Sequence, residues 1–210
     1  MMFADRVEAG RRLAGALGDL EGENVVVLGV PRGGVEVAAE VARAHGWPLD
    51  VVIPRKVGAP LNPELGLGAI APGVRVLDER MIRQLGVTED YLEREIAAQE
   101  EEIRRRTEAY RKGREAAEMA GRVAVVVDDG VATGGTAAAA LQWARAQQAS
   151  RVILAVPVAP REAVGRLSKE ADEVVCLATP DPFFAVGQWY EAFPQTSDQE
   201  VVELLERATA

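Results

Sequence analysis

Two adjacent acids follow the most apolar run of the chain. Residues 123–127 read Val-Ala-Val-Val-Val, and Asp128 and Asp129 come directly after them. Such a run predicts a buried parallel strand, whose carboxyl end is where open α/β sheets bind ligands. Two neighbouring carboxylates suit hydroxyl donors or a hydrated divalent cation. We therefore expect both side chains to contact a small polar ligand.

The turn after these acids suits a phosphate group. A helix is predicted to begin directly after it, and a helix N-terminus carries partial positive charge. Glycines let backbone N–H groups come close to an anion. Acids beside such a turn indicate a sugar phosphate, and a plain strand end with a glycine turn is the alternative. The turn residues are Ala132, Thr133, Gly134, Gly135 and Thr136.

Two further segments place basic residues near predicted strand ends. Arg32, Gly33 and Gly34 close the segment Gly-Val-Pro-Arg-Gly-Gly, which lies between an apolar run and a helical pattern. The segment does not match Gly-x-Gly-x-x-Gly, and the chain has no Gly-Lys-Ser/Thr P-loop, which argues against NAD and ATP sites. Arg55 and Lys56 follow the next apolar run. An ordinary turn with solvated charges is the alternative interpretation of both segments.

Residues 123–136 closely resemble the phosphoribosyl-pyrophosphate (PRPP) binding motif of the type I phosphoribosyltransferases. The resemblance implies that the turn binds the 5′-phosphate and that the two acids bind the ribose hydroxyls. It also implies that the first glycine loop and the basic residues after the second strand bind the diphosphate. The PRPP-binding residues implied in this way are Arg32, Gly33, Gly34, Arg55, Lys56, Asp128, Asp129, Ala132, Thr133, Gly134, Gly135 and Thr136.

The implied reaction transfers the 5-phosphoribosyl group of PRPP to a ring nitrogen of a nucleobase or related heterocycle and releases pyrophosphate. Mg²⁺ is the implied cofactor, with no direct protein ligand assigned and the two acids reaching it through water. Members specific for 6-oxopurines carry an acid where this chain has Ala132. Glu64 is the only acid within residues 57–70, where the family has a mobile catalytic loop. The implied catalytic residues are Asp128, Asp129, Arg32, Lys56 and Glu64.

Aromatic residues are concentrated near the end of the chain. Five of the ten aromatic residues lie within residues 183–193. Because aromatic faces stack on planar heterocycles, this stretch is a candidate for the base-binding hood of the family. Packing of the last helix or a contact between two subunits is the alternative. The candidate base-binding residues are Phe183, Phe184, Trp189 and Tyr190.

The elements that must position these residues alternate along the chain. Apolar strand patterns and helical patterns take turns, which predicts an α/β fold with a parallel sheet. The resemblance implies that this sheet is the parallel-sheet core of a type I phosphoribosyltransferase. We expect a single domain over residues 1–210, with a helical insertion at about 79–121 and a hood at about 180–210. The expected strands are 24–30, 49–53, 123–127, 151–156 and 173–178. The expected helices are 3–20, 35–44, 137–148, 160–169 and 198–206.

The middle of the chain departs from this alternation. Residues 58–66 contain Gly, Pro and Asn and predict a loop, followed by two short strands within 66–78. A long helix is predicted over 88–120, capped by Thr88. Its acids at 100–102 precede bases at 104–106, which predicts three i,i+4 ion pairs and a solvated face. The apolar stripe is narrow, so we expect this helix to lie partly clear of the core. The stripe consists of Leu92, Ile96, Ile103, Tyr110 and Ala117.

Composition excludes several classes of site. His45 and Cys176 are the single histidine and cysteine, which rules out disulfides within the chain and zinc sites built from Cys/His clusters. A net charge of −9 argues against nucleic acid as a partner. The chain has neither an apolar stretch of the roughly 18 residues that a membrane span needs nor the apolar core of a signal peptide at its start. We therefore expect a cytoplasmic protein with no nucleic-acid or membrane partner. We also expect a homodimer.

Two other functions are compatible with the same motif. A PRPP-sensing regulator would keep the fold without turnover, but such regulators resemble a DNA-binding module joined to this core. The predicted N-terminal helix is too short for such a module, and the charge is −9. A hydrolase that cleaves PRPP or a ribose phosphate with water as acceptor is the other alternative.

Overall fold

The core of the protein is a five-stranded parallel sheet. The computed structural model describes residues 2–208, so residues 1, 209 and 210 of the predicted domain lie outside the described residues. The strand order is β2-β1-β6-β7-β8, and every neighbouring pair is parallel, which confirms the predicted α/β core. The strands are β1 (Val25–Gly29), β2 (Leu49–Val51), β6 (Val123–Val127), β7 (Arg151–Val158) and β8 (Glu173–Ala178).

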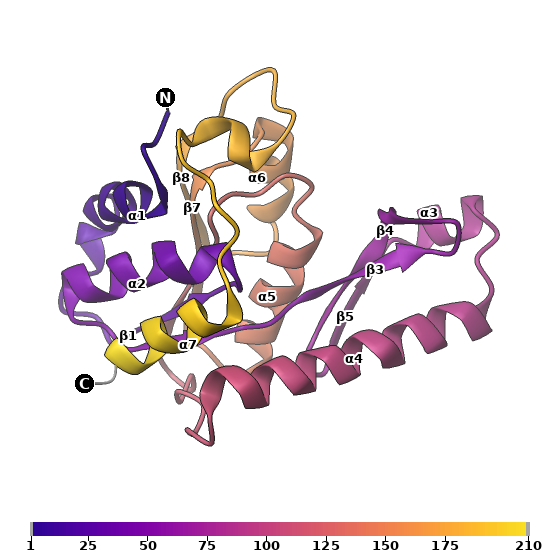
Figure 1. Cartoon of the computed structure of the whole chain (residues 1–210), viewed down its shortest axis with the longest axis horizontal. Helices are drawn as coiled ribbons and strands as arrows, with labels where there is room; N and C mark the ends of the chain where they lie inside the picture. The colour runs from indigo at the N-terminus through magenta and orange to yellow at the C-terminus, as the bar shows by residue number, and fades with distance from the viewer. Residues whose placement is uncertain (1, 209–210) are drawn as a thin grey trace.

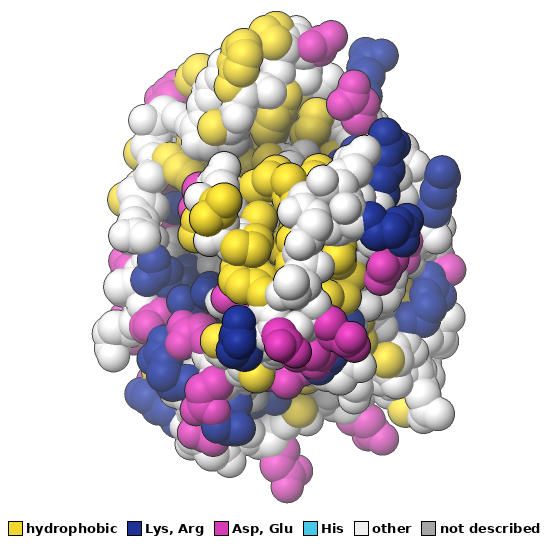
Figure 2. Space-filling view, turned by 90° about the vertical axis from the view of Figure 1, so that its right-hand side faces the viewer, with side chains coloured by type: hydrophobic (Ala, Val, Ile, Leu, Met, Phe, Trp, Pro, Cys, Tyr) yellow, Lys and Arg dark blue, Asp and Glu magenta, His cyan; other side chains and the backbone are white. Residues whose placement is uncertain are grey.

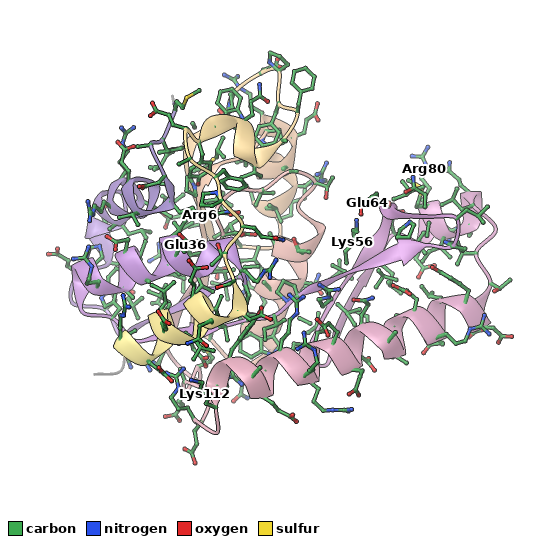
Figure 3. The ribbon with its side chains drawn as sticks, viewed as in Figure 1. Arg6, Glu36, Lys56, Glu64, Arg80 and Lys112 are labelled. Atoms are coloured by element: carbon green, nitrogen blue, oxygen red, sulfur yellow. The ribbon has the colours of Figure 1, made fainter. Side chains whose placement is uncertain are left out.

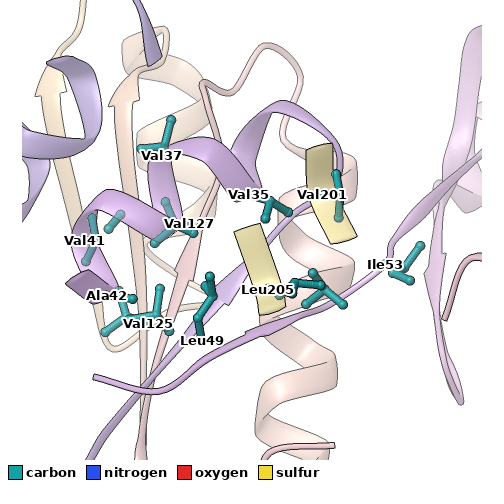
Figure 4. Close-up of a cluster of buried hydrophobic side chains, with 14 of the residues drawn as sticks. Val35, Val37, Val41, Ala42, Leu49, Ile53, Val125, Val127, Val201 and Leu205 are labelled. Carbon is teal, nitrogen blue, oxygen red and sulfur yellow. The ribbon is translucent and has the colours of Figure 1, made fainter. Parts of the chain in front are cut away.

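Helices cover both faces of this sheet because successive strand residues point to opposite sides. Val125 and Val127 face the side covered by α1, α2 and α7, and Ala124 and Val126 face the side covered by α5 and α6. Figure 4 shows part of the first cluster, with Val201 packed near Val35. The helices are α1 (Arg6–Gly15), α2 (Gly33–His45), α5 (Gly135–Ala146), α6 (Arg161–Leu167) and α7 (Asp198–Arg207), with short 3₁₀ turns at Gly18–Leu20 and Val186–Trp189.

An arm projects sideways from the core (Figure 1). It consists of a three-stranded antiparallel sheet and two helices. The predicted loop at 58–66 was wrong, because these residues belong mostly to two strands of the arm. Glycine serves close packing there: a Cβ on Gly58 would lie 2.8 Å from the Pro63 carbonyl oxygen, and one on Gly68 would lie 2.2 Å from that of Val76. The arm contains β3 (Arg55–Ala59), β4 (Asn62–Ala71), β5 (Val74–Leu77), α3 (Glu79–Gln84) and α4 (Glu89–Arg111).

Helix α4 runs the length of the arm and returns to the core beneath α7 (Figure 1). Thr88 caps it as predicted, and Ile96, Ile103 and Tyr110 are buried. The helix ends at Arg111 rather than near residue 120, because Lys112 adopts the left-handed conformation with φ of 47°. Ala117 therefore lies outside the helix, where its backbone N–H donates to Asp50.

The charged segment of α4 forms fewer of the predicted pairs than expected. Glu102 binds Arg106 at i,i+4 and also Arg105, and these two hydrogen bonds lower the pKa of Glu102 to about 2. Glu100 instead pairs with Arg75 of β5. The neighbouring strand thus competes with the helix for the acids on its face.

Figure 2 looks at the molecule from the side of the arm and shows hydrophobic side chains gathered in the middle of the view. Leu61, in the turn between β3 and β4, is fully exposed. Among residues 2–208, no helix combines the length and the apolar character that a bilayer crossing requires.

The arm is fastened to the core by Tyr110. Its side chain is fully buried, and its hydroxyl donates to Asp198 Oδ1 at 2.6 Å, in the first turn of α7. Burial, followed by this hydrogen bond, raises the pKa of Tyr110 to about 12, so the hydroxyl remains a donor at physiological pH.

Replacing Tyr110 with Phe should lower the free energy of unfolding by about 1–2 kcal/mol, because the variant loses a hydrogen bond to a carboxylate that is charged but partly exposed. Tyr91→Phe is a matched control, since the Tyr91 hydroxyl donates to the neutral carbonyl of Gly58. Urea unfolding of the two variants tests this, and an equal or larger loss in Tyr91→Phe would contradict it.

Candidate functional site

The acid pair meets the first glycine loop at the carboxyl edge of the sheet. Asp128 and Asp129 follow β6, and Gly33 and Gly34 open α2 after β1. A Cβ on Gly34 would lie 2.8 Å from Asp128 Cα, and one on Gly33 would lie 2.0 Å from Asp129 Oδ2. Backbone atoms therefore exclude a side chain at position 34, whereas a side chain at position 33 would displace the ends of the Asp129 and Arg6 side chains. The structure brings together the two loops that the sequence placed at separate strand ends.

The two acids are partly buried and lie in an electrostatically crowded place. Burial raises the pKa of Asp128 well above its ordinary value, and the neighbouring charge of Asp129 raises it further. Burial also raises the pKa of Asp129, although the hydrogen bond from Arg6 opposes this. The Asp129 backbone N–H donates to Asp128 Oδ1 at 2.8 Å. Hydroxyl donors or a cation would relieve this unfavourable charge.

The predicted phosphate turn lies beside the acids, at the N-terminus of α5. Gly134 is the N-cap and has φ of 84°, a left-handed conformation that favours glycine. Ala132 and Thr133 are exposed, and Gly135 begins the helix. The Thr133 carbonyl accepts a hydrogen bond from Arg166 of α6. The turn thus has a fixed shape, an open side and the positive end of a twelve-residue helix.

The first glycine loop points its arginine toward the last helix. The Pro31–Arg32 peptide bond is cis. The Arg32 side chain is 30% exposed, and its Nη1 lies 3.9 Å from Asp198 Oδ1. Arg32 is therefore a loosely paired cation at the edge of the glycine loop.

Arg55 and Lys56 do not lie together. They begin β3 rather than ending β2, so their side chains point to opposite faces of the strand. Arg55 Nε donates to Gln99 of α4 at 2.9 Å. Lys56 Nζ instead lies 3.1 Å from Glu64 Oε2, and Figure 3 shows this pair on the side of the arm away from α4. Glu64 is 91% exposed and belongs to β4.

The predicted hood divides into an anchor and a free part. Tyr190 is 5% exposed, packs against Phe3 and Phe193, and donates its hydroxyl to the Asp129 carbonyl at 2.5 Å. Its buried ring offers no open face, so the predicted base-stacking role of Tyr190 is not supported. Phe184 is 78% exposed. Phe183 stacks with Trp189, their ring centroids 6.2 Å apart.

Sequence reasoning missed Arg6, whose side chain is buried beside the acids. Arg6 Nε donates to Asp129 Oδ2 at 2.8 Å. In the first helix Arg6 is buried, whereas the neighbouring apolar residue Val7 is only partly buried. Its spacing of four residues before the buried Gly10 was the available signal, and a charged residue at a buried position is easily assigned to the surface.

A divalent cation fits this site only with help from water and ligand oxygens. No cluster of three or more His, Cys, Asp or Glu side chains suited to a metal occurs within residues 2–208. One of the two acids is already bound by Arg6. Mg²⁺ keeps several waters and commonly uses one or two carboxylates together with substrate phosphates, so this donor set suits it.

Comparisons with known proteins agree with the fold and the motifs. A family model described as the phosphoribosyl transferase domain matches residues 5–191. A Mycobacterium tuberculosis protein, named provisionally as a phosphoribosyl transferase, is 53% identical over 99% of this chain and 47% of its own length. The chain thus spans about half the length of the curated relatives it matches.

Solved structures extend this comparison. The protein TT1426 from Thermus thermophilus is 50% identical, with a TM-score of 0.84 over 99% of both chains. A Neisseria gonorrhoeae protein with bound ppGpp is 14% identical, with a TM-score of 0.51 over 99% of this chain and 94% of its own, and shares the fold.

Asp128→Asn should stabilise the protein against heat, by an amount that grows with pH. Because the pKa of Asp128 is raised on folding, the folded state binds more protons, and stability falls as the pH rises above the ordinary Asp value. Asn keeps an acceptor for the Asp129 N–H and removes the charge. We expect a higher midpoint of thermal unfolding at pH 8 and a smaller increase at pH 5.

Asp172→Asn is the control, and we expect it to lower the midpoint of thermal unfolding. The Val152 backbone N–H lowers the pKa of Asp172, so its charge stabilises the folded state at neutral pH. Calorimetry of both variants tests whether the charge of Asp128 destabilises the folded state, and a lower unfolding midpoint of Asp128→Asn at pH 8 would contradict it.

Proposed function

The chain belongs to the phosphoribosyl transferase domain family, and from that premise we propose that it transfers 5-phosphoribosyl groups. The donor is PRPP, the acceptor is a ring nitrogen of a nucleobase or related heterocycle, and pyrophosphate is released. The close contact of Gly33 and Gly34 with the two acids carries the proposal. A ligand with a diphosphate on one side of a ribose and a phosphate on the other matches this arrangement.

Each part of PRPP has a proposed partner. The turn 132–136 binds the 5′-phosphate through backbone N–H groups, threonine hydroxyls and the dipole of α5. Asp128 and Asp129 accept hydrogen bonds from the ribose hydroxyls, which relieves the charge that raises the pKa of Asp128. Phe183, Phe184 and Trp189 are the proposed stacking surface for the acceptor base.

Catalysis would come mainly from positioning and from stabilising the departing diphosphate. Arg32 is a candidate contact because its pairing with Asp198 is long and partly exposed. Lys56 is a second, since it is 40% exposed and pairs with Glu64, which is itself 91% exposed. Arg55 is held against α4 by Gln99 and is less accessible, although it remains part of the proposal.

Mg²⁺ would neutralise charge on the diphosphate when bound, with Asp128 and Asp129 reaching it through water. The chain's own residues then orient the ribose and separate the acceptor from bulk water. Glu64, from the arm, is proposed to assist the incoming nitrogen. A cytoplasmic location, a homodimer and the absence of a nucleic-acid partner are parts of the same proposal.

Pyrophosphate release from Mg-PRPP, measured with a panel of purines, pyrimidines and other nitrogen heterocycles, tests the reaction. We expect release that depends on one class of heterocycle. Release without any added base would instead favour hydrolysis, and PRPP binding without release would favour a sensor.

The variant Asp128→Asn with Asp129→Asn should lose at least about tenfold in PRPP affinity, because ligand hydroxyls lose charged acceptors. Asp19→Asn with Asp90→Asn is the matched control, since both residues are exposed acids away from the site. Calorimetric titration with Mg-PRPP gives the affinities. Unchanged affinity in the first variant would overturn the assignment.

A further inference from the structure

Arg6 is a buried cation from the N-terminal helix that reaches the acid pair. Its residue exposure is 5%. Its Nε lies 2.8 Å from Asp129 Oδ2, although the two residues are 123 positions apart in sequence. Figure 3 shows Arg6 beside Glu36 of α2, whose Oε1 lies 3.7 Å from Arg6 Nη1. The guanidinium therefore lies among carboxylates rather than at the surface.

The same guanidinium also holds the hood. Arg6 Nη1 donates to the Pro194 carbonyl at 2.6 Å, and Arg6 Cζ lies 3.9 Å from the centre of the Phe193 ring. A planar guanidinium can donate in two directions and stack on a ring at once, which an ammonium cannot do. Arg6 therefore joins one acid of the site to the segment that follows Tyr190.

The glycine loop closes the remaining side of this ion pair. A Cβ on Gly33 would lie 2.0 Å from Asp129 Oδ2, 2.6 Å from Arg6 Nε and 2.9 Å from Arg6 Nη2. The backbone of the loop thus packs directly on the ion pair and limits where the carboxylate can turn. The two acids therefore have different partners. Asp129 pairs with the buried guanidinium of Arg6, and Asp128 accepts a hydrogen bond from a backbone N–H.

We propose that Arg6 is a positioning residue for the phosphoribosyl transfer. It fixes the carboxylate of Asp129 for the ribose hydroxyls and ties that carboxylate to the hood, so that the ribose and base ends of the site form one unit. The inference rests on the proposed function. It assigns Arg6 no contact with the reacting atoms.

Calorimetric titration with Mg-PRPP tests this on the full chain, at a temperature where every variant is folded. Arg6→Met should weaken binding by about tenfold or more, because it leaves a buried carboxylate without its partner. Arg6→Lys should weaken binding less, because lysine keeps the positive charge but lacks the planar guanidinium that donates in two directions. Arg11→Met is the matched control, since Arg11 lies on the same helix, is 65% exposed at its side chain and pairs with Glu40 of α2.

A double-mutant cycle separates positioning from a general loss of structure. If Arg6 acts through Asp129, Arg6→Met should cost much less affinity in an Asp129→Asn background than in the wild type. If Arg6 has a merely structural role, the fold-loss in affinity of the double variant should equal the product of the fold-losses of the two single variants. If Arg6→Met does not fold, the same cycle with Arg6→Lys decides the question.

The outcomes distinguish this inference from the function on which it rests. Wild-type chain that fails to bind Mg-PRPP would overturn both. Wild-type binding with an Arg6→Met affinity within about twofold, or with independent losses in the cycle, would overturn the role of Arg6 alone.

Discussion

Two neighbouring carboxylates at the end of one apolar strand impose the main constraint on this structure. Burial and mutual repulsion raise the pKa of Asp128, and Asp129 is kept in place by a buried arginine. Neighbouring segments of the chain pack closely around the two acids and hold them in place. Gly33 and Gly34 pack against the acids, and Tyr190 donates to the carbonyl of Asp129. Such an arrangement costs stability and is expected where a ligand restores the balance.

The topology explains how distant segments reach the same edge. Strands β1 and β6 are parallel neighbours, so the loops that follow them both emerge at the carboxyl edge of the sheet. The first residues of the described chain and the predicted hood then meet there, since Phe3 and Tyr190 form a β-bridge and Arg6 contacts Pro194. The arm leaves from the same part of the sheet and is fastened by Tyr110 to the first turn of α7, beside Arg32. The site is therefore bordered by elements from the beginning, the middle and the end of the chain.

Local patterns in the sequence were sufficient for much of this. The apolar runs predicted the parallel strands, and Thr88 caps α4 as expected. Glycine was the main source of error in the arm, because Gly58 permits close packing against Pro63 there rather than marking a loop. The role of Arg6 depends on a partner 123 residues away, which local periodicity does not reveal. The burial of Tyr190 likewise follows from its contact with Phe3, so composition alone could not separate it from Phe184.

We propose above all that the acid pair and the glycine turn together recognise a ribose phosphate. Comparing the affinities of ribose 5-phosphate and 2-deoxyribose 5-phosphate tests it most directly, because the two ligands differ by one hydroxyl. A site that hydrogen-bonds this hydroxyl rejects the analogue that lacks it. We expect tighter binding of ribose 5-phosphate by the wild-type protein and loss of that preference in Asp128→Asn with Asp129→Asn. Equal affinities of the wild-type protein for the two sugars would contradict the claim.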